Sequence, residues 1–262
     1  MGEPTILALG GGGFTMEPDN PALDEFALSL TDAREPRVLF LPTASGDPAA
    51  QITAFYARFG RRCTATHLSL FRRHGADRSL AEIVLAQDLI YVGGGSMRNL
   101  LAIWAAHGLD ELLREAWRRG IPLAGLSAGA MCWFEGGVTR SGGPPEVIRG
   151  LGLLPGSFSV HADGEPERLP VWLAAVRRGE LPGGWAADDG VGLLFSGTRH
   201  VRTVASRPGT GALRADAVGG ELVRRRIEPE LLNAGVRPRD RPIPDEIAAL
   251  RALRAELRRG RR

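Results

Sequence analysis

The stretch that decides the fold is PLAGLSAGAMCW, residues 122–133. Its first half, LAGL, predicts a short buried strand, and the AGAM that follows the serine predicts the start of a helix. Between them lies the pattern G-x-S-x-G, formed by Gly125, Ser127 and Gly129. Glycines at these positions leave room for a sharp turn from strand to helix, which lifts the serine hydroxyl clear of the backbone. The pattern predicts that Ser127 is a nucleophile; the alternative is a glycine-rich turn with an incidental serine.

Short apolar strands alternate with amphipathic helices through the first half of the chain. Strands are expected at 5–9, 38–41, 64–70, 89–92 and 123–126, and helices at 21–33, 49–59, 79–86, 97–106 and 109–119. Helices between strands imply parallel βαβ units, so we expect an α/β protein with a doubly wound, mostly parallel sheet and helices on both faces. Sites of such sheets lie at the carboxyl ends of the strands. The glycines at 10–13, the glycines at 93–95 and Ser127 should therefore share one edge.

The alternation loosens after residue 133. Residues 134–156 are rich in glycine and proline and predict a loop, with a short strand at Val138 as an option. Beyond them the sequence predicts strands at 158–161, 191–195 and 201–206, a helix at 165–178 and a β-hairpin at 212–227. The C-terminal extension, 228–262, ends in an arginine-rich amphipathic helix at 244–259. Because there is neither an internal repeat nor a convincing linker, one domain over residues 1–262 is expected.

Composition narrows the class of protein. The 262 residues are 44% hydrophobic and carry a net charge of +3, which suits one large α/β core. No apolar run approaches the roughly 20 residues of a membrane span, and the N-terminus lacks the basic segment of a signal peptide. Two cysteines, Cys63 and Cys132, are too few for a disulfide scaffold and form no C-x-x-C metal motif, so a reducing cytoplasm is expected. For the basic terminal helix, a solvated face or a homodimer contact is favoured over nucleic-acid binding.

Two glycine runs follow predicted strands. The run at 93–95 lies beside the Ser127 strand and can present a backbone N–H to a developing oxyanion. Either Gly94 or Gly95 would supply that donor, and the N–H of Ala128, the residue after the serine, would supply the second. The run at 10–13 lacks both the Lys-Ser/Thr of a phosphate-binding loop and the spacing of a dinucleotide fingerprint. This run is equally consistent with a tight turn beside the active site and with a loop that binds a ligand.

A nucleophilic serine needs a base, and one of the five histidines fits. His161 ends the apolar strand SFSVH and opens the acidic loop ADGEPE. It also follows Ser127 in the chain, as the base follows the nucleophile in α/β serine hydrolases. A surface-loop histidine is the alternative. Structural or solvated roles are favoured for the other four, His67, His74, His107 and His200.

Three segments together carry a family resemblance: YVGGGSMRNLL at 91–101, GLSAGAMCWFEGG at 125–137 and GSFSVHADGEPER at 156–168. They resemble the peptidase E and cyanophycinase family of serine peptidases, over about residues 5–206. That family shares its fold with the class I glutamine amidotransferases, whose elbow carries cysteine. The resemblance implies Ser127 as nucleophile, His161 as base and an oxyanion site shaped by the 93–95 glycines. It implies no metal or organic cofactor, and a short peptide as substrate, such as a dipeptide cleaved after Asp, or an aspartyl-arginine polymer.

The third catalytic residue is where the chain departs from the family. Members often carry an aspartate in a Thr-Asp-Ser context soon after the elbow helix, where this chain has Arg140 between Thr139 and Ser141. An arginine cannot accept the imidazole N–H. Glu135, in the same segment, is our first choice and would give a Ser-His-Glu triad. Further candidates, each also consistent with an ordinary loop acid, are Glu146, Asp163 and Asp189.

Recognition of an aspartyl substrate would need a basic residue near the serine. Arg98, Arg140, Arg149 and Arg168 are available, and Arg140 and Arg168 are the expected substrate-binding residues.

Two other classes of function stay open. One is a cyanophycinase-like or other hydrolase, such as an esterase, on the same scaffold. The other is a non-enzymatic binding protein with a decayed site, which the arginine at 140 motivates.

Overall fold

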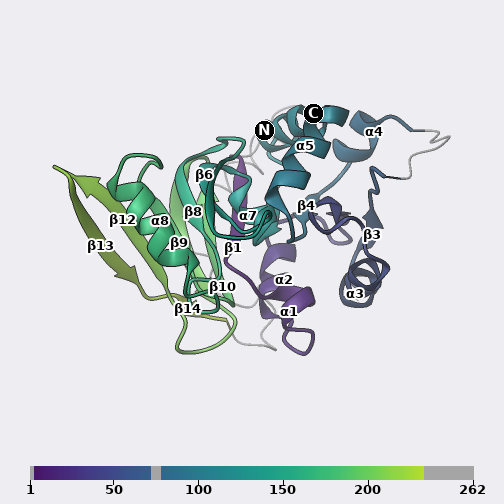
Figure 1. The fold of residues 1–262 in the computed structure, drawn as a ribbon. Coiled ribbons are helices and arrows are strands. Elements are labelled where there is room, and N and C mark those ends of the chain that lie inside the picture. The colour runs from purple at the N-terminus through teal and green to yellow at the C-terminus, as the bar shows by residue number, and fades with distance from the viewer. Residues whose placement is uncertain (1–2, 72–77, 233–262) are drawn as a thin grey trace, which may run out of the picture.

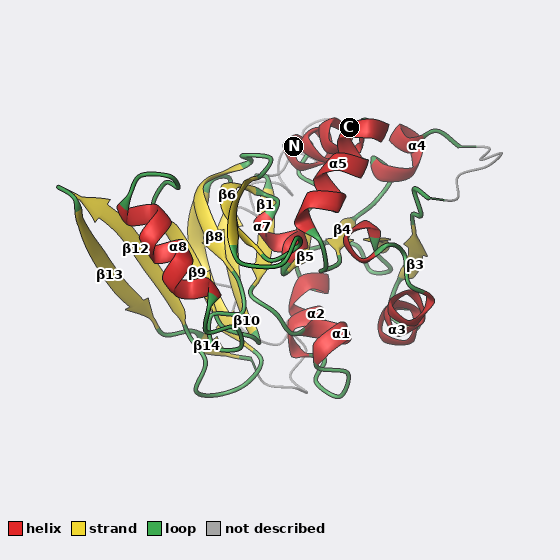
Figure 2. Cartoon of the chain, viewed as in Figure 1, coloured by secondary structure: helices red, strands yellow, loops and turns green. Residues whose placement is uncertain are grey.

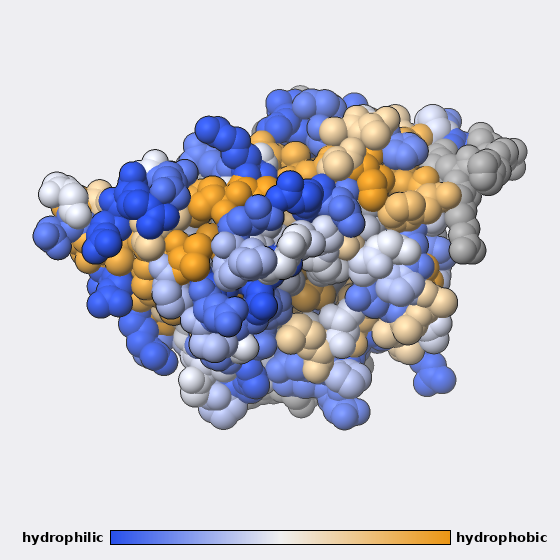
Figure 3. Space-filling model, in the orientation of Figure 1, coloured by the Kyte–Doolittle hydropathy of each residue, from blue (hydrophilic) through white to orange (hydrophobic). Residues whose placement is uncertain are grey.

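The computed structural model describes residues 3–71 and 78–232 of the chain, and every element below lies within them (Figure 1). The helix expected at 244–259 lies outside the described residues, as does most of the C-terminal extension. No helix in the described part is long and apolar enough to cross a membrane. Figure 3 shows hydrophilic residues interspersed with hydrophobic ones on the face in view.

An eight-stranded sheet forms the centre of the fold, in the order β14-β11-β10-β1-β5-β4-β2-β3 (Figure 1). Its five parallel strands are β1 (Thr5–Leu9), β5 (Leu123–Leu126), β4 (Leu89–Val92), β2 (Arg37–Leu41) and β3 (Thr64–His67). Strand β10 (Val191–Ser196) pairs antiparallel with β1, β11 (Arg199–Ala205) pairs antiparallel with β10, and β14 (Glu230–Leu231) runs parallel to β11. The predicted, mostly parallel α/β sheet is confirmed.

Helices cover both faces of this sheet (Figure 2). They are α1 (Gly13–Met16), α2 (Ala22–Leu28), the 3-10 turn η1 (Thr43–Ser45), α3 (Ala49–Phe59), α4 (Leu80–Val84), α5 (Met97–His107), α6 (Leu109–Arg118) and α7 (Ala128–Met131). Neighbouring residues of β1 show why both faces are apolar. Leu7 and Leu9 pack with α1–α3, whereas Ile6 and Ala8 pack with α5–α7. The strand is therefore hydrophobic along its whole length, as buried parallel strands are.

A second sheet has six strands, in the order β13-β12-β9-β8-β6-β7, with α8 (Arg168–Arg177) packed on it. Its strands are β6 (Phe134–Thr139), β7 (Glu146–Arg149), β8 (Leu154–Ser159), β9 (Gly184–Ala187), β12 (Ala212–Val218) and β13 (Glu221–Ile227). The predicted hairpin at 212–227 is confirmed as β12 and β13. The prediction of a loop over 134–156 is wrong, because that segment holds β6, β7 and the start of β8. The strand offered as an option at Val138 is present, as part of β6.

Glycines within strands explain the wrong prediction. A Cβ atom on Gly137 of β6 would lie 2.4 Å from the carbonyl oxygen of Phe158 in β8, and one on Gly184 of β9 would lie 1.9 Å from that of Ser157. Glycine is needed at these points because two backbones pass close together. In the sequence the same glycines are typical of loops, so β9 is not predicted and β6 is expected only as an optional short strand at Val138.

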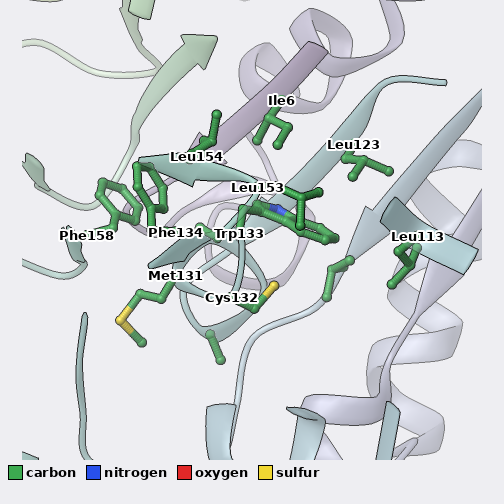
Figure 4. Close-up of a cluster of buried hydrophobic side chains, with 14 of the residues drawn as sticks. Ile6, Leu113, Leu123, Met131, Cys132, Trp133, Phe134, Leu153, Leu154 and Phe158 are labelled. Atoms are coloured by element: carbon green, nitrogen blue, oxygen red, sulfur yellow. The ribbon is translucent and has the colours of Figure 1, made fainter. Parts of the chain in front are cut away.

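A core centred on Trp133 connects the two sheets (Figure 4). Trp133 is fully buried, and its ring centroid lies 5.9 Å from that of Trp104 in α5. The next residue, Phe134, stacks on Phe158 of the second sheet with centroids 4.9 Å apart. Ile6 of the central sheet belongs to the same cluster. Because Trp133 and Phe134 follow α7 closely and are fully buried, the turn at Ser127 is anchored in the hydrophobic core.

Candidate active site

Ser127 occupies the sharp turn between β5 and α7, with φ 53° and ψ −117°. Non-glycine residues seldom adopt a positive φ, and such strain persists only where the surroundings impose it. A Cβ on Gly125 would lie 2.0 Å from the carbonyl oxygen of Gly129, and one on Gly129 would lie 2.5 Å from that of Val92. Both glycines of the motif are therefore sterically required. The strand, turn and helix expected from the sequence are present.

His161 lies beyond the end of β8 and faces the serine. Its Nε2 is 2.8 Å from Ser127 Oγ, a hydrogen-bond distance. Its backbone is held as well, because the His161 N–H donates to the carbonyl oxygen of Gly10 at 3.2 Å. The φ of His161 is 52°, so this residue too has an uncommon backbone conformation. The structure thus brings together the two residues that the sequence singled out.

Asp189 completes the series. Its Oδ1 lies 2.5 Å from His161 Nδ1, on the side of the ring away from Ser127. It lies in the turn that joins β9 to β10. The side chains of His161 and Asp189 are 13% and 20% exposed, so the pair is shielded but reachable from solvent. Serine, imidazole and carboxylate in this order form the arrangement of a serine-hydrolase triad.

Glu135 lies elsewhere, and ranking it first as the acid is a prediction that the geometry corrects. Its Oε2 accepts a hydrogen bond from the Gly156 N–H at 2.7 Å, which ties β6 to β8. Glu146, another candidate, pairs with Arg98. Asp189, one of the other candidates, is the acid that reaches His161, and the pairing of the strands that precede the two residues explains why. Strands β8 and β9 are parallel neighbours, so the residues just beyond their ends come together.

The glycine loop at 10–13 packs against the histidine–aspartate pair. A Cβ on Gly11 would lie 1.9 Å from Asp189 Oδ1 and 2.9 Å from His161 Nδ1. A Cβ on Gly10 would lie 2.5 Å from the carbonyl oxygen of Asp188. Of the two readings left open by the sequence, this contact favours the tight turn beside the active site.

The two candidate oxyanion glycines differ in their surroundings. A Cβ on Gly94 would lie 3.2 Å from the Cβ of Ser127, so Gly94 is adjacent to the serine. Gly95 has φ 138°, and a Cβ there would meet the backbone atoms of Ala44 and Ser45. Ala128, the first residue of α7, is fully buried next to the serine. Of the two glycines, Gly94 is therefore the one whose added Cβ would meet the serine.

Arg140 and Arg168 gather around the loop that His161 opens. The Arg140 guanidinium lies 3.7 Å from a carboxylate oxygen of Glu165 and 3.6 Å from one of Glu167. Arg168 Nη2 lies 2.8 Å from the same oxygen of Glu165. Arg168 is only 5% exposed, and its Nε and Nη1 have no hydrogen-bond partner among the described residues. Burial lowers the pKa of Arg168, and the charge of Glu165 opposes that shift.

Neither a metal site nor a reactive thiol stands out in the described residues. No group of three or more His, Cys, Asp or Glu side chains there could hold a metal ion. Cys132 is buried just after α7, and burial raises the pKa of its thiol well above the usual value. Burial also raises the pKa of Cys63, to about 11. Both thiols are therefore poor nucleophiles at neutral pH.

Comparisons with known proteins identify the family of the chain. The model of peptidase family S51 matches residues 6–203. An uncharacterized peptidase of Bacillus subtilis, YgaJ, is 49% identical over 210 residues, which cover 80% of this chain and 90% of YgaJ. Peptidase E of Streptomyces coelicolor is 32% identical over 155 residues, or 52% of this chain and 61% of that protein. The crystal structure of a peptidase from an acI-B1 Actinobacterium has a TM-score of 0.65 at 22% identity, covering 87% of this chain and 95% of that one.

Each comparison supports a different part of the conclusion. The solved structure, at its low identity, shows the α/β fold alone. The predicted class I glutamine amidotransferase type agrees with a partial similarity to imidazole glycerol phosphate synthase subunit HisH of Geobacillus thermodenitrificans, 36% identical over 93 residues, or 34% of this chain and 41% of that protein. The family model covers most of the chain, including the serine elbow and His161. The chain belongs to peptidase family S51 and is a serine-type peptidase.

Proposed function

We propose that this peptidase hydrolyses short peptides, dipeptides in particular, through an acyl-enzyme formed on Ser127. The observation that carries the proposal is the hydrogen-bonded series from Ser127 Oγ through His161 to Asp189 Oδ1. A serine hydroxyl is a weak nucleophile until an adjacent base takes its proton, and the base works best when a third group orients it. Each member of this series lies within hydrogen-bond distance of the next.

The reaction proceeds in two halves. His161 Nε2 takes the proton of Ser127 as Oγ attacks the carbonyl carbon of the scissile peptide bond, and the protonated imidazole then gives that proton to the leaving amine. A water molecule, deprotonated by the same nitrogen, attacks the acyl-enzyme and releases the carboxylic acid and free Ser127. Asp189 keeps the Nδ1–H directed toward itself, so that Nε2 faces the serine, and stabilises the imidazolium.

The developing oxyanion would be bound by backbone N–H groups. We assign these to Ala128 and Gly94, with Gly95 as the alternative to Gly94. What supports the choice is the contact between Gly94 and Ser127 and the position of Ala128 directly after the serine. Fixed N–H donors of this kind stabilise a tetrahedral intermediate without any reorganisation during the reaction.

Arg168 and Arg140 are proposed to bind an acidic group of the substrate, with aspartate before the scissile bond as the side chain to test first. Arg168 supports this because its guanidinium is buried with two nitrogens that lack partners. A buried charge without enough hydrogen bonds is costly, and a substrate carboxylate would supply the missing acceptors. Arg140 is more exposed and pairs only loosely with Glu165 and Glu167.

A dipeptide panel tests the proposal. The panel compares Asp-X with Asn-X, Glu-X and Ala-X peptides, and includes simple esters, for the wild type and for Ser127→Ala and His161→Ala. Peptide cleavage that disappears in both variants is the expected result. Ester cleavage without peptide cleavage would favour an esterase on the same scaffold. Equal rates for Asp-X and Asn-X would refute the aspartyl preference but not the peptidase mechanism.

The alternative of a non-enzymatic binding protein with a decayed site is no longer needed. Its motivation is Arg140, which stands at a position where relatives often carry the catalytic acid. Asp189 stands against His161 instead, so the arginine leaves the proposed triad complete.

A further inference from the structure

The turn that carries Asp189 is clamped by two charged side chains from other segments. Arg207, just beyond the end of β11, donates from Nε and Nη2 to the carbonyl oxygen of Asp189, at 3.3 and 3.1 Å. The same Nη2 donates to Asp163 Oδ2 at 3.1 Å. Asp163 in turn accepts the Asp189 N–H on its Oδ1, at 2.8 Å. Both peptide groups that flank the Asp189 Cα are therefore held by side chains.

The clamp connects the parts of the proposed triad. Asp163 lies in the loop opened by His161, so its bond to the Asp189 N–H ties the histidine loop to the aspartate turn. Arg207 adds a third segment, which follows the central sheet's β11. A rotation of the Asp189 peptide groups would change the position of the carboxylate, and hence the orientation of the imidazole.

Arg207 is itself fixed by its neighbours. The Ser206 N–H donates to the carbonyl oxygen of Gly190 at 2.8 Å, and Ser206 Oγ donates to Glu17 Oε2 at 2.7 Å. The Arg207 guanidinium also lies 3.9 Å from Glu17 Oε1. It thus lies beside the carboxylates of Glu17 and Asp163, whose mutual repulsion its charge offsets.

We propose that Arg207 and Asp163 are positioning residues that act together to hold Asp189 against His161. The inference rests on the proposed function. Neither residue touches Ser127 in the structure, so both act through the geometry of Asp189. Removing either one should lower kcat, because the His161–Asp189 geometry matters most when the imidazolium forms, and should leave KM nearly unchanged.

Kinetics of Arg207→Gln, Asp163→Asn and the double variant test the proposal, with Arg178→Gln as the matched control. Arg178 pairs with Glu180 on an exposed turn and has no contact with the site. A kcat loss of roughly 10- to 100-fold is expected for each single variant, from misplacement of the pair. The double variant should be no slower than the worse single one, because the two residues form one unit. Arg207→Lys should recover part of the loss, since a lysine keeps the charge but not the fork of donors.

A second readout reports the geometry without any substrate. The proton between His161 Nδ1 and Asp189 should give a far-downfield NMR signal in the wild type, to be assigned by its loss in Asp189→Asn. The signal should broaden or vanish in Arg207→Gln and persist in Arg178→Gln, at temperatures where circular dichroism shows all variants folded.

The outcomes separate the two claims. Unchanged kcat and an unchanged signal in both single variants would refute the positioning role. A raised KM with unchanged kcat would also refute it, and would make Arg207 a substrate-binding residue. If the wild type cleaves no peptide, the proposed function fails and the NMR signal alone decides the role of the clamp.

Discussion

His161 and Asp189 each stand two residues beyond the end of a strand, and the two strands are parallel neighbours. Strand β8 ends at Ser159 and β9 at Ala187, so the register delivers both side chains to one edge of the second sheet. Their Nδ1 and Oδ1 atoms lie 2.5 Å apart. Ser127 comes from the corresponding edge of the central sheet, and its Oγ lies 2.8 Å from the other ring nitrogen. The candidate site is thus built where the carboxyl ends of strands from both sheets meet.

The acid of the triad can be identified by comparing two conservative substitutions. Asp189→Asn should lower kcat by roughly 10³- to 10⁴-fold, because an amide in place of the carboxylate favours the wrong imidazole tautomer. Glu135→Gln should keep nearly full activity, since Glu135 bonds to Gly156 and not to the histidine. Steady-state kinetics on the best dipeptide measure both. The reverse order of the two effects would restore Glu135 as the acid.

Alanine at position 11 should disable the site by steric displacement. Its Cβ would lie 1.9 Å from Asp189 Oδ1, so Gly11→Ala must push the carboxylate away from His161. A loss in kcat of about 100-fold is expected from a shift of roughly 1 Å. Gly142→Ala is the control, because its Cβ would meet only the end of the Glu146 side chain, at 3.3 Å. Equal activity of both variants would mean that the aspartate position is not critical.

Thiol reagents should leave the activity intact. Cys132 is buried, the pKa of Cys63 is raised to about 11, and neither thiolate forms readily at neutral pH. Iodoacetamide should therefore not inhibit the wild type, while Ser127→Cys, with its thiol beside His161, should be alkylated rapidly. Time courses of residual activity and of adduct mass would show this. Inhibition of the wild type that tracks alkylation of Cys132 would contradict it.

Asp24 should make the stability of the fold depend on pH. It is buried between the Phe14 N–H, 3.3 Å from Oδ1, and the Arg58 guanidinium, 3.1 Å from Oδ2. Burial raises the pKa of Asp24 from the ordinary 3.8 to about 7, and the Arg58 charge only partly opposes this. Between these values the folded state binds more protons than the unfolded state, so the free energy of unfolding falls as pH rises from about 4 to about 7.

Asp24→Asn removes this proton uptake and should flatten the trend. Urea unfolding of both proteins at several pH values would compare their slopes. The wild type should lose at most about 1.4 kcal/mol more per pH unit than the variant, the limit for one proton. Parallel stability curves for the two proteins would show that Asp24 does not titrate in this range.

The sequence was most informative where burial and sterics leave few options. Apolar runs such as 89–92 and 123–126 predicted parallel strands, because strands buried on both faces need hydrophobic residues throughout. The glycines around Ser127 predicted the turn, because no larger residue fits there. The run SFSVH predicted a strand leading to His161, although β8 ends at Ser159, two residues earlier than expected. These elements can be predicted from the local sequence, without knowing which distant residues they contact.

The acid could not be found in the same way. Its position depends on β9, a strand that begins with Gly184 because the backbone of Ser157 passes too close for a Cβ. That glycine is needed for a contact between residues far apart in sequence, so it is not distinguishable from a loop glycine locally. Because β9 is not predicted, no pairing of strands connects Asp189 with His161 in the sequence. Glu135 is favoured instead because it lies in the segment where relatives often carry the aspartate. A strand predicted at 184–187 would have supplied the missing signal.

The central claim is that Ser127 is the activated nucleophile, and covalent labelling tests it most directly. The protein is treated with a fluorophosphonate, digested, and mapped by mass spectrometry while peptide hydrolysis is followed in parallel. The account predicts one adduct per chain, on Ser127, with activity lost in proportion and no adduct in Ser127→Ala. A folded protein that takes up no label at Ser127, or a Ser127→Ala variant that still cleaves peptides, would contradict it.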